Sequence, residues 1–378
     1  MSYQQHDEVN GMSESTCRWG FLSTAAIARK NWKAIHLSGN GRVSCVASRT
    51  EERAQAFVDE CSREVPPAEP VAAVGSYEEL IARDDVDAIY IPLPTGIRTE
   101  WCLAAAKAGK HLLCEKPAAV NEQEVQQILD ACQQAGVQFM DGVMFDHSRR
   151  LAEIRRELDS GDSIGKLRRI CTHFSFSGDQ SFQQSNIRTD SVLEPHGCLG
   201  DLGWYCIRMT LWAAGLQMPT EVSARTIKPL QGDQSAGSVP GEFSAELQFP
   251  NDISATFYCS FLTENQQTVL LSGDKGYLTV DDFVLPFYDA EASWSTHQHV
   301  LEIDNCRWNF RRSSTRKAIA EYASGEANSS EVNMVRRLGE IHLSKQLDPL
   351  YPELAIKTQR VLDACRQSDI EGGKRISL

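Results

Sequence analysis

The chain has 378 residues, of which 42% are hydrophobic and 24% are charged, and its formal net charge is -13. This composition is ordinary for a soluble globular protein, and the length suffices for two or three domains. The acidic balance disfavours nucleic acid and anionic membranes as partners, because binding to phosphates needs clustered Lys and Arg. No apolar stretch approaches the roughly 18 residues of a membrane span. We therefore expect small-molecule partners, no nucleic acid and no membrane.

The N-terminal segment and the cysteines bear on the cellular compartment. Residues 1–16 are polar and lack the apolar core of a signal peptide, so we expect a disordered tail. The twelve cysteines are scattered through apolar segments, without any Cys-x-x-Cys pair. This distribution favours reduced thiols in a cytoplasmic protein over a disulfide framework. It gives little support to a metal site, and we expect none.

From Arg18 onward, short apolar runs alternate with longer amphipathic segments, the pattern of βαβ units on a parallel sheet. Gly109 and Gly136 follow two of the amphipathic segments, as helix C-terminal stops do. The pattern predicts an α/β domain over residues 17–145. Its predicted strands are residues 19–22, 43–47, 71–74, 88–91, 111–114 and 138–140, and its predicted helices are residues 27–36, 51–61, 77–82, 99–108 and 121–135.

The turn after the first predicted strand is where a dinucleotide fingerprint is expected. Glycines normally make a tight turn there and let the backbone approach a pyrophosphate at a helix N-terminus. In this chain the glycine positions carry Ser23, Ala25 and Ala28. Small residues still permit the approach if their backbone is unstrained. Two interpretations stay open: a cofactor site that includes Ser23, Thr24, Ala25 and Ile27, or a turn that has lost the cofactor.

The end of the second predicted strand bears on the type of cofactor. An acidic residue there usually binds a free ribose 2′-hydroxyl, whereas Arg binds a 2′-phosphate. This chain has Ser48, Arg49 and Thr50 at that place. A guanidinium flanked by hydroxyls can hold a phosphate, which favours NADP over NAD. The alternative is that Arg49 only caps the strand at the surface.

The tripeptide Glu115-Lys116-Pro117 follows the buried run of residues 111–114. Ligands of open parallel sheets bind outside the carboxyl ends of the strands, so Lys116 is expected to face a crevice. There it can donate a proton or hold a substrate hydroxyl. The alternative is a Glu-Lys pair on an ordinary surface loop.

After about residue 150 the apolar residues alternate with polar ones, which predicts antiparallel strands with one solvated face. The segment 273–276 fits a hairpin turn, and residues 231–241 are typical of a loop. We predict a second domain of α+β character over residues 146–378. Its predicted strands are residues 167–176, 220–227, 243–249, 254–261, 268–272 and 276–280.

The segment 194–208 combines glycines with polar residues at helical spacing. Asp201 and Tyr205 are four apart, so they share a face if a helix begins near Leu199, and Arg208 can extend that face. A tyrosine suits proton transfer at a sugar hydroxyl when a nearby lysine lowers its pKa. The alternative is a solvated tyrosine and a helix-capping aspartate.

Together and in this order, these motifs resemble the glucose-fructose oxidoreductase / inositol dehydrogenase (Gfo/Idh/MocA) family over almost all of residues 17–378. The resemblance is closest to the branches that contain dihydrodiol dehydrogenases and xylose dehydrogenases. It rests on Arg18-Trp19-Gly20 with Ile27-Ala28-Arg29, Ser48-Arg49, Gly75-Ser76-Tyr77-Glu78-Glu79-Leu80, Ile91-Pro92-Leu93-Pro94-Thr95, Glu115-Lys116-Pro117 and Gly200-Asp201-Leu202-Gly203-Trp204-Tyr205.

The resemblance implies an N-terminal Rossmann dinucleotide-binding domain and a C-terminal α+β domain with a large, mainly antiparallel open sheet. It implies an NADP-dependent oxidoreductase for a sugar, polyol or cyclic diol, assembled as a homodimer or a dimer of dimers. Carried over by position, Lys116, Asp201 and Tyr205 form the catalytic group, with Lys116 keeping the tyrosine acidic. The resemblance places Pro92, Leu93, Pro94, Glu115 and Lys116 beside the cofactor.

The chain departs from the family pattern at two further places. Arg98 stands where many relatives carry histidine, and His196 stands where they often carry a small residue. His196 is either a pocket residue or a structural histidine. His147 is the first candidate for a substrate contact outside the catalytic group, and Arg188 is a weaker one.

Two other functions remain open within this resemblance. Some relatives use tightly held NAD in a redox-assisted glycoside cleavage, which releases free sugar without net NADP turnover. A cofactor-binding sensor without catalysis is the other alternative, because a shared fold does not guarantee shared chemistry.

Overall fold

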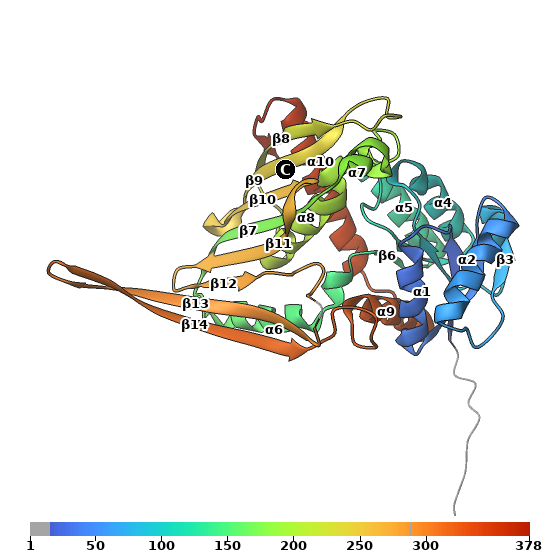
Figure 1. Cartoon of the computed structure of the whole chain (residues 1–378), viewed down its shortest axis with the longest axis horizontal. Helices are drawn as coiled ribbons and strands as arrows, with labels where there is room; N and C mark the ends of the chain where they lie inside the picture. Colours follow the sequence, from blue (N-terminus) through green and yellow to red (C-terminus); the bar gives the residue numbers. More distant parts are fainter. Residues whose placement is uncertain (1–15, 288) are drawn as a thin grey trace, which may run out of the picture.

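The computed structural model describes residues 16–287 and 289–378. A six-stranded sheet, built by the first part of the chain, and a nine-stranded sheet organise these residues. In Figure 1 the six-stranded sheet and its helices lie on the right and the nine-stranded sheet lies on the left. The predicted disordered tail lies outside the described residues, except for Thr16.

The six-stranded sheet is parallel throughout, in the order β3-β2-β1-β4-β5-β6. This is the strand order of a doubly wound dinucleotide-binding fold. Such strands are apolar along their whole length because helices cover both faces of the sheet. The predicted parallel α/β arrangement is confirmed. The strands are β1 (Cys17–Leu22), β2 (Gly41–Ala47), β3 (Ala72–Val74), β4 (Ala88–Ile91), β5 (His111–Cys114) and β6 (Phe139–Asp141).

Local signals set several helix ends around this sheet. The side chains of Thr50, Ser76 and Asn121 cap three helix N-termini, and Gly136 ends one helix with φ of 67°. The helices are α1 (Ala28–Ser38), α2 (Glu51–Glu64), α3 (Tyr77–Ile81), α4 (Thr95–Lys107) and α5 (Glu122–Ala135).

The start of α4 differs from the prediction. The helix begins at Thr95 instead of residue 99. The backbone N–H and the hydroxyl of Thr95 donate hydrogen bonds to the Glu194 carboxylate at 3.1 and 2.6 Å. This cap comes from a distant part of the chain, so the local sequence pattern does not reveal it.

The nine-stranded sheet has the order β14-β13-β12-β11-β7-β10-β9-β8-β15. Its pairs are antiparallel except for β7 with β10, which confirms the predicted mainly antiparallel sheet. The strands are β7 (Leu167–Ser177), β8 (Glu221–Leu230), β9 (Val239–Gln248), β10 (Ser254–Ser260), β11 (Leu262–Gly273), β12 (Tyr277–Val280), β13 (Glu291–Asp304), β14 (Arg307–Ala320) and β15 (Ile376–Ser377).

Helices of the second half cover one face of this sheet, with α8 against β7 and α10 against β8. Among the described residues, no helix has the length and apolar character needed to cross a membrane. The remaining elements are η1 (Met144–His147), α6 (Arg149–Ser160), α7 (Gln180–Ser185), η2 (Ile187–Thr189), η3 (Leu199–Gly203), α8 (Trp204–Ala213), η4 (Pro250–Asp252), α9 (Ser330–Ser344) and α10 (Leu350–Ile370).

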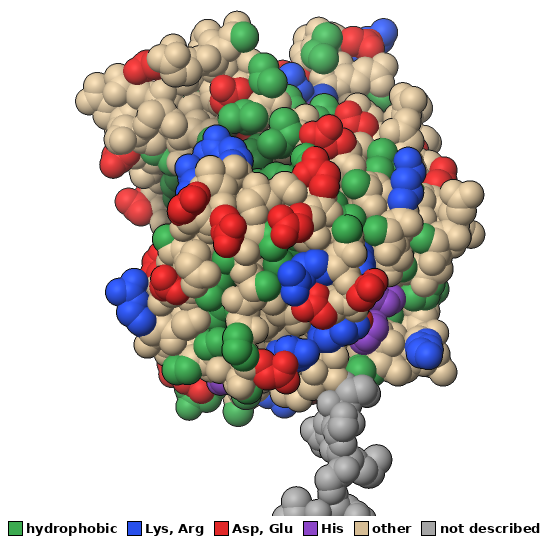
Figure 2. Space-filling model, turned by 90° about the vertical axis from the view of Figure 1, so that its right-hand side faces the viewer, with side chains coloured by type: hydrophobic (Ala, Val, Ile, Leu, Met, Phe, Trp, Pro, Cys, Tyr) green, Lys and Arg blue, Asp and Glu red, His purple; other side chains and the backbone are tan. Residues whose placement is uncertain are grey.

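Helix α9 returns from the end of the chain to the first sheet. Val332, Val335 and Leu338 of α9 are fully buried in one hydrophobic cluster with Trp32 and Ile35 of α1. The core of the six-stranded sheet is therefore completed by residues far outside its own part of the sequence. On the side of the molecule shown in Figure 2, acidic and basic side chains are intermixed over the surface.

Candidate active site

The crevice of the six-stranded sheet lies where β1 and β4 are neighbours, because the chain leaves these strands toward opposite edges. Ser23, Thr24 and Ala25 follow β1, and residues 92–94 follow β4. Glu115 and Lys116 follow β5. The topology thus brings the predicted cofactor residues of three loops to one edge of the sheet.

Ser23 keeps the backbone conformation of the missing glycine. Its φ is 127°, a value that side chains rarely adopt, at a cost on the order of 1–3 kcal/mol. Its hydroxyl accepts a hydrogen bond from the Ala25 backbone N–H at 3.2 Å. The condition of an unstrained backbone is therefore not met at Ser23, which adopts a conformation that favours glycine.

The N-terminus of α1 is open toward the same turn. Ile27 precedes the helix with 46% of its surface exposed, no side chain caps this end, and the first turn contains no acidic residue. The helix dipole favours an anion at such a position. This end of α1 fits a pyrophosphate.

Two arginines, Arg49 and Arg53, lie shortly after the end of β2. Ser48 is buried, and its backbone N–H donates to the Val74 carbonyl at 3.2 Å. Arg49 and Arg53 are exposed, and among the described residues neither guanidinium forms an ion pair with a carboxylate. Both lie close enough to Tyr77 to oppose the rise in its pKa that burial causes. Sequence reasoning missed Arg53, although Thr50 as a helix cap places it on the first turn of α2.

Asp201 is the centre of the candidate catalytic cluster. Lys116 Nζ donates to the Asp201 carboxylate and, at 3.0 Å, to its backbone carbonyl. Arg188 Nε donates to the other carboxylate oxygen at 2.7 Å. The side chains of Lys116, Asp201 and Arg188 are 10%, 13% and 41% exposed, so the cluster is reachable from one side through Arg188.

The two cations hold Asp201 in its charged form. Burial alone raises the pKa of Asp201, but Arg188 and Lys116 outweigh this effect and lower the pKa to about 2. Asp201 lies on η3, a π-helical turn immediately before α8. Such turns are frequent at functional sites because they re-aim side chains within a helix.

Tyr205 lies beside this cluster. Lys116 Nζ is 5.0 Å from the centre of its ring, and Phe145 and Phe174 pack on the ring from other elements. Burial, then Glu115 and Asp201, raise the pKa of Tyr205 well above its ordinary value. The expectation that Lys116 keeps this tyrosine acidic was wrong, because burial and the neighbouring carboxylates of Glu115 and Asp201 raise the pKa of Tyr205. The hydroxyl is therefore a protonated group at neutral pH.

Arg98 supports the loop that carries Lys116. Its guanidinium is buried and donates to the carbonyls of Leu93, Glu115 and Pro117, with Nε to Leu93 at 2.8 Å and Nη1 to Glu115 at 2.6 Å. The Arg98 side chain is therefore directed into the protein. Its hydrogen bonds connect the loop after β4 to the loop after β5. Its charge has no carboxylate partner among the described residues.

The two histidine candidates lie outside the hydrogen-bonded cluster. His196 is buried, and its Nε2 lies 2.6 Å from the Val120 carbonyl oxygen. Burial lowers the pKa of His196 to about 4, so its ring is neutral. His147 stacks on Tyr351 of α10 with ring centres 5.4 Å apart. Of the three predicted substrate residues, only Arg188 is bonded to Asp201.

Arg208 does not extend the polar face of Asp201 and Tyr205. It is fully buried and pairs with Asp141 and Asp146, both at 2.6 Å. Its Nε also donates to Thr358 of α10 at 2.9 Å. Arg208 therefore joins the end of β6 to the helices of the second half, and its role is structural.

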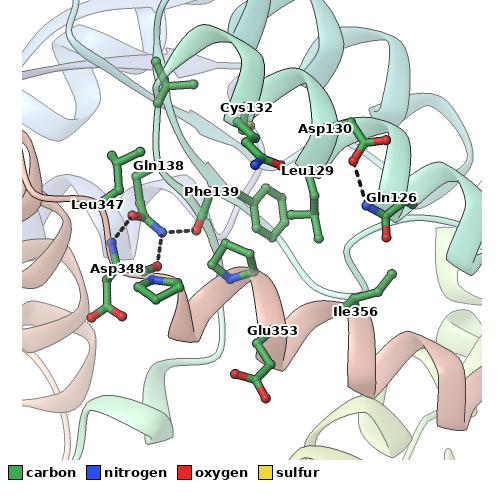
Figure 3. Close-up of a pocket in the computed structure, with 14 residues that line it drawn as sticks. Gln126, Leu129, Asp130, Cys132, Gln138, Phe139, Leu347, Asp348, Glu353 and Ile356 are labelled. Carbon is green, nitrogen blue, oxygen red and sulfur yellow. Dashed lines mark hydrogen bonds between the residues drawn. The ribbon is translucent and has the colours of Figure 1, made fainter.

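A separate groove of about 460 Å³ lies between α5 and the start of α10 (Figure 3). Gln138 closes one end of it by donating to the Asp348 carbonyl at 3.0 Å and accepting from the Asp348 N–H at 2.8 Å. The residues that line this groove do not include Lys116, Asp201 or Tyr205. It is distinct from the candidate active site.

Comparison with protein families gives two matches. The oxidoreductase family with an NAD-binding Rossmann fold, GFO_IDH_MocA, matches residues 17–143. The GFO/IDH/MocA C-terminal domain matches residues 151–279. Together the two matches cover most of the chain.

Individual relatives match more than two thirds of the chain. D-xylose 1-dehydrogenase (NADP(+)) 2 of Haloferax volcanii is 29% identical over 335 residues, which are 88% of this chain and 96% of that protein. Trans-1,2-dihydrobenzene-1,2-diol dehydrogenase of Mus musculus is 29% identical over 272 residues, which are 71% of this chain and 76% of that protein.

Solved structures share the fold. The 3-ketoreductase KijD10 from Actinomadura kijaniata, in complex with NADP and TDP-benzene, has a TM-score of 0.76 at 22% identity, covering 94% of this chain and 98% of that chain. The aldose-aldose oxidoreductase from Caulobacter crescentus, complexed with glycerol, has a TM-score of 0.77 at 21% identity, covering 96% and 100%.

Proposed function

The chain belongs to the Gfo/Idh/MocA oxidoreductase family, and from this premise we propose that it transfers a hydride between NADP and a hydroxyl-bearing or carbonyl carbon of a sugar, polyol or cyclic diol. The observation that carries the proposal is the cluster of Lys116, Asp201 and Arg188 beside the buried Tyr205. A binding module has no need for a charged lysine and a protonated tyrosine held at one place.

The residues present fit NADP as the cofactor. The strained turn at Ser23 and the uncapped end of α1 suit a pyrophosphate, and the exposed Arg49 and Arg53 suit a 2′-phosphate. NAD is less favoured, since the residues directly after β2 are Ser48, Arg49 and Thr50, and none of these is acidic. When bound, the cofactor supplies or accepts the hydride. The residues proposed to line its nicotinamide end are Pro92, Leu93, Pro94, Glu115 and Lys116.

The protein's own groups handle the substrate oxygen. Tyr205, kept protonated by burial, donates a proton to the carbonyl oxygen in the reductive direction and takes it back in the oxidative one. Lys116 holds that oxygen, and Asp201 fixes the ammonium in place. Arg188, bonded to Asp201 through Nε alone, directs its other donors toward a further substrate hydroxyl.

The names of the relatives support the substrate class. They act on D-xylose, on a dihydrobenzene diol and on a deoxysugar nucleotide. The shared feature of these substrates is a carbon that bears a hydroxyl or keto group on a small ring or chain. We propose the same feature for the substrate of this chain.

The first experiment is a titration of the purified protein with NADPH and with NADH, followed by nicotinamide fluorescence. Arg49→Ala is expected to raise the NADPH dissociation constant by about 10- to 100-fold and to leave the NADH constant nearly unchanged, because the lost contact is to the 2′-phosphate. Arg63→Ala, an exposed arginine in the last turn of α2, is the matched control. Equal losses for both cofactors would refute the assignment of Arg49.

The same titration tests the proposal as a whole. Tight NADPH binding justifies a screen of sugars, polyols and cyclic diols for turnover. A native protein that binds neither cofactor would contradict the proposed dehydrogenase activity.

A further inference from the structure

Another pocket, of about 580 Å³, lies between η1, α6, the end of α8 and the start of α10. This volume is in the range of small-molecule sites. We call it the α6–α10 pocket. The residues that line it do not include Lys116, Asp201 or Tyr205, so it is distinct from the candidate active site. Its wall is mostly apolar or aromatic and is formed by Leu151, Trp212, Leu216, Leu350, Tyr351 and Leu354.

Asp146 contributes a carboxylate to this wall. Arg208 Nη1 donates to its Oδ2 at 2.6 Å, whereas its Oδ1 accepts no hydrogen bond from any of the described residues. The side chain of Asp146 is 11% exposed, and because this residue lines the pocket, the exposed part opens into it. The pocket therefore combines an apolar wall with one carboxylate oxygen that can bind a ligand.

The charges around Asp146 do not balance. Arg208 is fully buried and pairs with both Asp141 and Asp146, so the three ionised side chains carry a net charge of -1. An uncompensated charge inside a protein is costly. The other titratable groups beside Asp146 are neutral at pH 7, since burial raises the pKa of Tyr351 to about 12 and lowers the pKa of His147 to about 3. A cation in the pocket would supply the missing charge.

The pocket's own basic residue does not supply it. Arg155 is the one basic residue among the described residues that line the pocket. Its guanidinium lies 3.6 Å from the Asp159 carboxylate and 4.6 Å from the centre of the Trp212 ring, and it donates to the Trp212 carbonyl. Arg155 is thus engaged by these groups. Its place over Trp212 also shows that this aromatic wall accommodates a cation.

We propose that the α6–α10 pocket binds a small organic amine, with the ammonium group on Asp146 and the apolar body against Trp212 and Leu354. An ammonium and a carboxylate form a charge-assisted hydrogen bond, and the apolar wall removes the body of the ligand from water. An anion would be repelled by Asp146, and a neutral molecule would leave its charge uncompensated. The pocket lies apart from the catalytic cluster, so the proposal does not rest on the proposed function.

The affinity for an amine is expected to depend on pH through Asp146. Burial, opposed by Arg208 and reinforced by Asp141, raises the pKa of Asp146 to about 6. Below this pH the carboxyl group is neutral and no longer attracts an ammonium. The amine itself stays protonated in this range. Its dissociation constant is therefore expected to rise by about 10-fold as the pH falls from about 7 to 5.

The test is isothermal titration calorimetry of the full-length protein at about pH 7.5 with 2-phenylethylamine and with 2-phenylethanol, in which a hydroxyl replaces the ammonium. The native protein is expected to bind the amine at least about 10-fold more tightly than the alcohol. Asp146→Asn keeps an acceptor for Arg208 but removes the charge, so it is expected to abolish this preference. Asp162→Asn is the matched control, because Asp162 is an exposed aspartate just after α6 and does not line the pocket.

A second variant tests the pocket without changing its charge. Ala152 is an exposed residue of α6 that lines the pocket, and Ala152→Phe is expected to weaken the binding of both probes at least about 10-fold because its ring occupies the space. Circular dichroism and thermal melting check that all variants fold.

Three outcomes would overturn the proposal. The first is a native protein that binds both probes equally, or neither at about 10 mM. The second is a preference for the amine that survives in Asp146→Asn. The third is unchanged binding in Ala152→Phe, which would place the amine elsewhere on the protein.

Discussion

Tyr205 is the residue whose hydroxyl the proposed chemistry requires. Tyr205→Phe is expected to lower kcat by about 10²- to 10⁴-fold, because the general acid is lost. Its NADPH dissociation constant is expected to stay unchanged, since phenylalanine preserves the packing on Phe145 and Phe174. Steady-state kinetics with the best substrate of the screen, combined with the fluorescence titration, measure both. Tyr258→Phe, on the open sheet face, is the control. Unchanged turnover in Tyr205→Phe would exclude this residue as the proton donor.

Asp201 links the site to the pH dependence of stability. Its pKa falls from an ordinary value of 3.8 to about 2 in the folded protein, so its charged form stabilises the fold. This contribution, about 2 kcal/mol, is present above pH 4 and is lost as the pH falls from about 4 to 2. Asp201→Asn is expected to lower the free energy of unfolding at neutral pH and to flatten its fall in that range.

Urea unfolding at several pH values measures this difference, with Asp233→Asn as the control, because Asp233 is an exposed loop residue. A free energy of unfolding for Asp201→Asn that falls with pH as steeply as that of the native protein would show that the carboxylate is not held by Lys116 and Arg188.

Single residues also show which relations between side chains local sequence patterns predict and which they do not. The spacing of Asp201 and Tyr205 predicted a shared location, and the structure places both next to Lys116. The pairing of Arg188 with Asp201 was not visible from spacing, because the two residues lie in different elements, η2 and η3. Arg53 was missed although the predicted helix began at residue 51 as α2 does, because its proximity to Tyr77 together with Arg49 is a tertiary contact.

At the scale of elements, Arg98 of α4 joins the loops after β4 and β5. Arg98→Met is expected to destabilise the protein by about 2–4 kcal/mol, because the buried carbonyls of Leu93, Glu115 and Pro117 lose their donor. It is also expected to lower kcat, since the Lys116 loop loses its support. Arg98→Lys keeps the charge with fewer donors and is expected to be intermediate.

Urea unfolding and steady-state kinetics check this prediction at the same pH. A stable Arg98→Met variant with native kcat would show that the loop holds its shape without the guanidinium. Rescue of both quantities by Arg98→Lys would show that charge alone is sufficient.

At the scale of the whole molecule, the two proposed domains, residues 17–145 and 146–378, share a hydrophobic cluster. α9 lies in the second part of the sequence but buries Val332, Val335 and Leu338 against α1 in the first. A fragment of residues 17–145 is therefore expected to lack cooperative unfolding, because an apolar face of its core is exposed. Thermal melting followed by circular dichroism tests this.

A matched chimera joins the same fragment to residues 330–344 through a flexible linker. It is expected to regain a cooperative transition, since α9 supplies the missing part of the core. A sharp transition in the fragment without α9 would show that the N-terminal part folds by itself.

The sequence by itself determined the alternation of strands and helices around the first sheet, six of the nine strands of the second sheet, the parallel and mainly antiparallel classes, and the family; β13, β14 and β15 were not predicted. These follow from local periodicity, from turn residues and from short motifs, each contained within a few residues of the chain. β4 and β5 were predicted with their observed ends because fully buried parallel strands are continuous apolar runs.

The tertiary structure alone decided what depends on contacts between distant segments. Only it shows that Glu194 starts α4, that Arg208 is a structural ion pair and that Tyr205 has a raised pKa. Burial and the sign of neighbouring charges fix such properties, and neither is encoded within one segment of the sequence.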